Sequence, residues 1–346
     1  GYYLFQTLID SDNLRGTFIT PNTGHTLEII AAGLKDSNQD VRIRSLTCAN
    51  ALLNHLHVED PVVTQYIQLL PAIIQVINFS VEDGDDRVSV GFELLSTLTE
   101  EFMVHLQPMV PDLLRFTLTV SANTALEASL RQHALYFIEF IIENKPKSFL
   151  ANVNLQDVIH LCFLVMTESD EEDDEENSLR MYGSQIIDVL ALEIPSKYVW
   201  QPIMERVVQY IQSPRAVERR AAIVAVTVIS EGCADRVEEN FEQVIPWILA
   251  GLKDERQVRQ SALVAVSEIA KNLSDALGPY HEVLVPLLLQ ATTDQADIIC
   301  IKAYYAISHY IACDPEALLP HLDVLLKHLM SGLNHENMEV KELALN

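Results

Sequence analysis

The chain has little glycine, few cysteines and no long apolar run. Only 11 of its 346 residues are glycine, and its five scattered cysteines include no CxxC pair. This pattern argues against a disulfide framework or a zinc site and favours buried thiols in a reducing compartment, so we expect an intracellular, soluble protein. The longest apolar stretches, at 223–229 and 283–289, fall far short of the roughly 18 residues that a membrane span needs. No basic segment with an apolar core opens the chain, so we expect no signal peptide.

Basic residues are also in short supply. Lysine and arginine together number 23, against 49 aspartates and glutamates, which gives a formal net charge of −26. A chain this acidic repels phosphate backbones, so direct nucleic-acid binding is not expected. The charge instead favours association with a basic protein partner.

Apolar residues recur with the spacing of helices rather than strands. Leu263, Val266, Ile269 and Ala270 illustrate the i, i+3, i+4, i+7 pattern, and almost no segment alternates apolar and polar residues with a period of two. We therefore expect helix nearly throughout, in the order helix, short turn, helix, longer turn.

The helices repeat with a period near 40 residues. A basic residue recurs near the start of the second helix of each pair, usually after an apolar residue, in steps of 89, 49, 39, 40 and 82 residues: Arg42, Arg131, Arg180, Arg219, Arg259 and Lys341. These steps fit one period with two weak members and one insertion. A proline column marks the first helices at Pro71, Pro111, Pro246 and Pro286, with Pro202 close to the same place, and predicts a kink there in each.

A helical pair of about 40 residues cannot bury its apolar face alone, so this period predicts a stacked array of pairs. The predicted fold class is all-α, an α-α superhelix of about eight helical pairs that is truncated at both ends and belongs to a longer protein. The array occupies 1–346, with approximate units at 24–57, 61–105, 107–145, 151–194, 197–233, 239–273, 279–313 and 316–346.

An acidic run interrupts the fourth unit at 168–176, where eight of nine residues are acidic. Dense like charges oppose compaction, which predicts an extended loop and accounts for the 49-residue step across this unit. One interpretation is a solvated loop that only aids solubility, and another is a binding segment. A calcium site is the weakest alternative, because the run lacks the spaced ligands and turn glycine of an EF-hand.

The signatures resemble known repeat families. A proline in the first helix, a short acidic turn such as Lys35-Asp36 and a second helix that opens with Val-Arg are similar to HEAT repeats. An acidic loop inside a central repeat resembles the importin-β (karyopherin-β) superfamily, in the branch that imports ribosomal proteins and histones. The segments that carry this second resemblance are 190–195, 229–233 and 319–328.

The resemblance implies a nuclear import receptor that moves between cytoplasm and nucleus. Its partners would be basic cargo such as ribosomal proteins and histones, Phe-Gly nucleoporins at the nuclear pore, and the GTPase Ran, which releases cargo. The family's amino-terminal Ran-binding repeats are not recognisable in this sequence. In the family the central acidic loop contacts Ran or cargo, and that role would fall on Glu168, Asp170, Glu171, Glu172, Asp173, Asp174, Glu175 and Glu176.

Aligning the second helices reveals a further acidic pattern that does not depend on the resemblance. Carboxylates fall at two aligned positions four residues apart, which share one helix face. We refer to these residues as the acidic row, and expect it on the concave side of the stack, where a Lys/Arg-rich segment would bind along units two to five. The neighbouring columns, which hold the arginines, are expected to be exposed. An ordinary solvated acidic face is the alternative. The row comprises Glu100, Glu139, Glu143, Asp188 and Glu231.

Motifs for catalysis are missing. The sequence contains no GxGxxG, GxxxxGK[ST], GxSxG or HExxH. We therefore expect no enzyme activity, no cofactor and no metal. A second function remains open, a HEAT-repeat scaffold subunit of a multiprotein complex such as a phosphatase scaffold.

Overall fold

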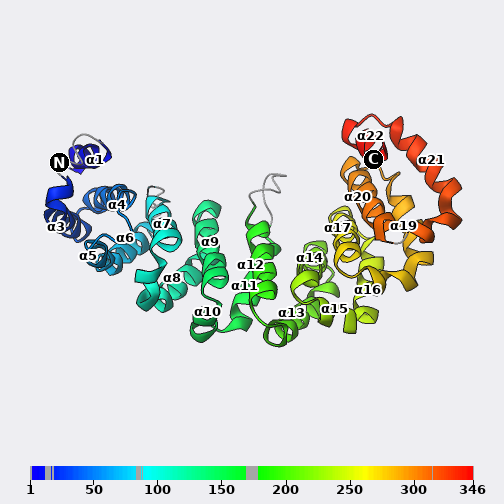
Figure 1. Ribbon diagram of the computed structural model, residues 1–346, viewed down its shortest axis with the longest axis horizontal. Coiled ribbons are helices and arrows are strands. Elements are labelled where there is room, and N and C mark those ends of the chain that lie inside the picture. Colours follow the sequence, from blue (N-terminus) through cyan, green and yellow to red (C-terminus); the bar gives the residue numbers. More distant parts are fainter. Residues whose placement is uncertain are drawn as a thin grey trace. The chain divides into compact units, whose positions relative to one another are not determined.

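The computed structural model describes residues 2–11, 17, 19–82, 87, 89–168, 178–313 and 315–345 (Figure 1). Over these ranges all regular elements are helical, which confirms the predicted all-α class. The chain divides into two compact units, an N-terminal unit of Gly1–Val153 and a C-terminal unit of Asn154–Asn346.

The N-terminal unit contains two full antiparallel pairs and additional short helices. Its second helices α4, α7 and α9 pack against one another in chain order, and α1 packs on α4. The helices of this unit are α1 (Tyr2–Asp10), α3 (Thr23–Leu34), α4 (Gln39–Leu53), α5 (Val63–Ile67), α6 (Leu70–Glu82), α7 (Ser89–Leu106), α8 (Val110–Ala122), α9 (Ala128–Asn144) and α10 (Pro146–Asn152).

The C-terminal unit repeats the same arrangement. Each first helix packs on the second helix that follows it, and the second helices α12, α14, α17, α20 and α22 form one continuous row, most of which Figure 1 shows side by side. Its helices are α11 (Leu155–Met166), α12 (Leu179–Glu193), α13 (Ser196–Ile211), α14 (Ala216–Gly232), α15 (Ala234–Glu239), α16 (Phe241–Gly251), α17 (Arg256–Asn272), α18 (Ser274–Leu277), α19 (His281–Ala291), α20 (Asp297–Cys313), α21 (Leu322–Leu333) and α22 (Met338–Leu345).

Second helices are buried on most of their circumference. In α17, nine residues are buried, among them Val258, Ala262, Val266 and Ile269, because the helix contacts α16, α14 and α20 at once. What remains accessible is a narrow stripe at every third or fourth position: Gln260, Val264, Glu268 and Lys271. The row of second helices therefore presents one stripe per helix to the surroundings.

A glycine permits the close approach of two second helices in the C-terminal unit. A Cβ on Gly232, in the last turn of α14, would lie 2.4 Å from the carbonyl carbon and oxygen of Ala191 on α12. Because those atoms belong to the backbone, they have no rotamer by which to move aside.

The proline column has two structural meanings, so the predicted common kink is wrong. Pro71 and Pro111 are the second residues of α6 and α8, where the missing N–H would have no helical partner in any case. Pro202, Pro246 and Pro286 lie inside α13, α16 and α19.

Candidate functional site

In the N-terminal unit, three residues of the acidic row gather around one tyrosine. The Tyr136 hydroxyl on α9 donates to Glu100 Oε1 on α7 over 3.0 Å. Burial, this hydrogen bond and the negative charges of Glu100, Glu139 and Glu143 raise the pKa of Tyr136 to about 12. Glu100 and Glu143 are exposed and Glu139 is half-buried. Their negative charge is thus concentrated on the accessible stripes of α7 and α9.

An aromatic pair lies inside this cluster. The rings of Tyr136 and Phe140 are one helical turn apart on α9, with their centroids 6.5 Å apart and their planes tilted by 50°. Both side chains are half-buried, so apolar ring surface and carboxylates share one accessible area. Nothing in the acidic pattern itself pointed to the rings, although their i, i+4 spacing places them on a single face of the helix.

In the C-terminal unit, the two remaining residues of the acidic row influence each other. Partial burial and, to a smaller extent, the negative charge of Glu231 on α14 raise the pKa of Asp188 on α12 to about 6. Two carboxylates held on neighbouring helices disfavour each other's ionised form. This pair would gain from a nearby cation.

The acidic row does not extend to α17. The positions that align with the row hold Ser267 and Lys271, and the Ser267 hydroxyl is hydrogen-bonded to His309 Nδ1 on α20. Burial and the Lys271 charge lower the pKa of His309, while Glu268 acts in the opposite direction. Sequence reasoning missed this contact, because the 41-residue offset between α17 and α20 moves His309 off the aligned columns.

Most of the acidic run of the fourth unit, Asp170–Glu176, falls outside the described residues. Glu168 is described and follows the end of α11, where its backbone N–H donates to the Val165 carbonyl over 3.2 Å. The proposed binding role of this run stays a prediction.

The arginine column is not exposed, contrary to the prediction. Arg131 is 3% exposed and its Nε donates to the Ser121 carbonyl over 2.9 Å. Arg219 is also partly enclosed, with 18% of its side chain exposed. These guanidinium groups support the repeat structure from within, so they do not flank the acidic row as free surface charge.

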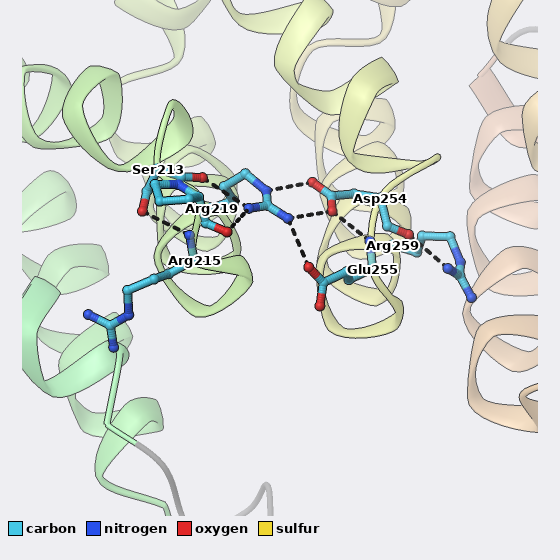
Figure 2. A network of polar contacts seen from close by, with 7 residues as sticks. Ser213, Arg215, Arg219, Asp254, Glu255 and Arg259 are labelled. Carbon is cyan, nitrogen blue, oxygen red and sulfur yellow. Dashed lines mark hydrogen bonds and ion pairs between the residues drawn. The ribbon is translucent and has the colours of Figure 1, made fainter.

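Figure 2 shows how Arg219 links two successive pairs. Its guanidinium forms two 2.7 Å contacts with the carboxylate of Asp254 and a 3.3 Å contact with Glu255, both just before α17. It also donates to the Ser213 carbonyl of its own turn over 2.9 Å. Arg259 repeats the arrangement one pair later, at 2.9 Å from Asp294. A side chain long enough to reach the next turn explains the 40-residue spacing of this column.

An open cleft of about 410 Å³ lies beside first helices of the N-terminal unit. It is formed at the turn between α3 and α4 and along α6 by Leu34, Lys35, Asp36, Arg42, Gln75, Val76 and Phe79. The Phe79 ring is 46% exposed, and the Arg42 guanidinium carbon lies 5.9 Å from its centre. The cleft combines apolar walls with cationic groups, and it lies away from the first-helix stretches, 241–252 and 280–289, suggested by the sequence.

Two other kinds of site were searched for in the part of the chain that the structure describes. No group of three or more His, Cys, Asp or Glu side chains there could hold a metal ion. No single described helix has both the length and the apolar character to cross a membrane, although α10 and α11 taken together as a bent pair pass that test.

Comparisons with known proteins agree with the repeat architecture. A family profile described as "IPO5-like, TPR repeats" matches residues 15–116. Importin subunit beta-3 of Saccharomyces cerevisiae is 28% identical over 64% of the chain, and human importin-4 is 24% identical over 62%. The crystal structure of Kap121p bound to RanGTP superposes on 93% of the chain with a TM-score of 0.75 and 25% identity. The chain belongs to the importin-β superfamily.

The relatives are much longer than this chain. It spans 22% of importin subunit beta-3, 21% of importin-4 and 33% of the Kap121p structure. Other crystal structures show Kap121p bound to Nup53p and to Ste12p. This importin-β superfamily chain therefore corresponds to part of such a receptor.

Proposed function

We propose that the chain is part of a nuclear import receptor that binds basic cargo on the accessible stripes of its second helices. The observation that carries the proposal is the clustering of Glu100, Glu139 and Glu143 within the N-terminal unit, together with the Asp188 and Glu231 pair within the C-terminal unit. Uncompensated carboxylates on one face cost free energy unless a cation occupies that face, and a Lys/Arg-rich segment supplies such cations. Cargo of this class includes ribosomal proteins and histones.

The proposal includes passage through the pore and release by Ran. Kap121p, with which this chain shares its fold, has been crystallised with RanGTP and with Nup53p. The cleft beside Phe79 offers apolar walls of the size that a phenylalanine side chain of a Phe-Gly nucleoporin would fill. On this proposal the receptor shuttles between cytoplasm and nucleus. A scaffold subunit would instead bind a folded catalytic partner and ignore basic peptides.

The test is a charge reversal on the second helices. Changing Glu139, Glu143 and Asp188 together to Lys should weaken the binding of a fluorescent Lys/Arg-rich peptide by at least about tenfold at low salt, with the wild-type affinity falling as salt rises. Fluorescence anisotropy provides the measurement. The matched control changes three exposed acids outside the acidic row, Glu238, Glu242 and Glu282, to Lys. Equal affinities for the two triple variants would refute the proposal.

A second measurement addresses release. Cargo bound to the full-length protein in a cell extract should be lost when GTP-loaded Ran is added and retained with GDP-loaded Ran. Basic clients that stay bound in both conditions would argue against import and in favour of a scaffold.

A further inference from the structure

The accessible face of α9 carries more than negative charge. Tyr136 and Phe140 are the two aromatic side chains on this stripe, and the Tyr136 hydroxyl is held by Glu100 of the neighbouring helix. Glu143 lies one turn beyond Glu139 on the same helix. Ring faces and carboxylates therefore converge on the same small area from two helices, α7 and α9.

This combination has a specific chemical meaning. An aromatic face attracts a cation through its quadrupole, and the attraction adds to that of a nearby carboxylate. A purely structural aromatic pair would be buried in the core, whereas both rings here are only half-buried. A neutral apolar partner would have to approach three carboxylates, which disfavours it.

We propose that Tyr136 and Phe140, with Glu100 and Glu143, form a subsite for one cationic side chain of the bound segment. The ammonium or guanidinium group lies against the rings, and the carboxylates neutralise it. This inference rests on the proposed function, because it assigns a residue-level role within the same cargo-binding face. It makes the two aromatic residues, rather than the acids alone, determinants of which basic segments bind.

The orientation of Tyr136 supports the assignment. Its hydroxyl is tied to Glu100 over 3.0 Å, which fixes the ring against rotation of its side chain and holds Glu100 beside it. A pre-arranged ring and carboxylate lose less conformational entropy when the ligand binds. The negative surroundings also keep the phenol protonated at neutral pH, so the ring carries no charge of its own.

The experiment compares four peptides of one basic sequence, in which the central residue is lysine, arginine, Nε-acetyl-lysine or Nε-trimethyl-lysine. Phe140→Leu and Tyr136→Leu each remove a ring but keep apolar volume, and each should weaken binding of the lysine, arginine and trimethyl-lysine peptides by about two- to fivefold. Tyr136→Phe keeps the ring and should change affinity less. Tyr198→Leu, which removes a half-exposed ring from the first helix α13, is the matched control.

Specific outcomes would overturn the proposal. If the leucine variants bind every peptide as the wild type does, while Glu143→Lys weakens binding, the acids act alone and the aromatic subsite does not exist. If acetyl-lysine binds as well as lysine, the site does not recognise a cation. If the wild-type chain binds no basic peptide at all, the proposed function fails instead, so the two failures are distinguishable.

A site-specific label covers the case in which a leucine variant folds poorly. Fluorine-labelled phenylalanine at position 140 leaves the ring in place, and its ¹⁹F resonance should shift when the lysine peptide is added but not when the acetyl-lysine peptide is added. An unchanged resonance at saturating lysine peptide would place the segment elsewhere and overturn the inference.

Discussion

The two compact units share one architecture but treat charge on their second helices differently. In the C-terminal unit, Arg219 and Arg259 each reach the acidic turn of the next pair, so opposite charges meet at 2.7 to 2.9 Å. On α7 of the N-terminal unit, carboxylates accept from neutral donors instead, Glu100 from Tyr136 and Glu93 from Asn50 at 3.4 Å. A neutral donor satisfies a carboxylate's hydrogen bond but leaves its charge in place. The comparison teaches that one repeat fold can use its acids either for cohesion or for an external field.

The sharpest test of how tightly each unit is packed is a glycine substitution. Gly232→Ala in the C-terminal unit places a methyl group against the Ala191 backbone and should destabilise the chain by about 2–4 kcal/mol. In the N-terminal unit, a Cβ on Gly91 meets the Ile77 side chain, which can change rotamer, so Gly91→Ala should cost less. Urea unfolding of both variants checks the order. Gly24→Ala, with nothing within 4 Å, is the neutral control. Equal losses for the first two variants would contradict this difference.

The next effect concerns the ion pairs. Arg219→Ala leaves Asp254 partly enclosed and without its bidentate partner, and should cost about 1–3 kcal/mol. Arg87→Ala removes a contact with Asp40 in which both side chains are largely exposed, and should cost less than about 1 kcal/mol. Urea midpoints at two salt concentrations separate the cases, because only the exposed contact is strongly screened. A larger loss for Arg87→Ala would break the comparison.

The smallest effect is a pH dependence of opposite sign at two aspartates. Hydrogen bonds from Arg219 lower the pKa of Asp254, so the stability that this carboxylate contributes is present above its unfolded pKa and is lost as pH falls. Asp188 has its folded pKa raised from 3.8 to about 6, so its contribution is greatest below pH 3.8 and is lost as pH rises through 6.

Asp188→Asn should therefore stabilise the chain at pH 7.5 by about 1 kcal/mol, after allowance for solvent screening, and by almost nothing near pH 4. Asp254→Asn should destabilise it at pH 7.5. Unfolding free energies measured at both pH values provide the check. A destabilised Asp188→Asn at pH 7.5 would show that Glu231 and burial do not act on Asp188 as described.

The all-α class and the pairing of helices followed from the 40-residue period, because a repeat that recurs in sequence must recur in packing. The alignment also placed Glu139 and Glu143 on the face where the structure finds them acting on Tyr136. It failed for the arginines, because a column position gives the direction of a side chain but not how far it reaches. Arg219 aligns as a surface residue, yet its length carries it into the next turn. Whether the acidic row binds cargo stays a prediction.

The narrow accessible stripe of each second helix bears on how such receptors diversify. Because about one residue in four on α17 faces outward while its neighbours hold the stack together, exchanges confined to that stripe alter recognition without disturbing stability. Evolution could thus retune the partner of each helix independently, through a handful of substitutions per repeat, on an otherwise unchanging frame.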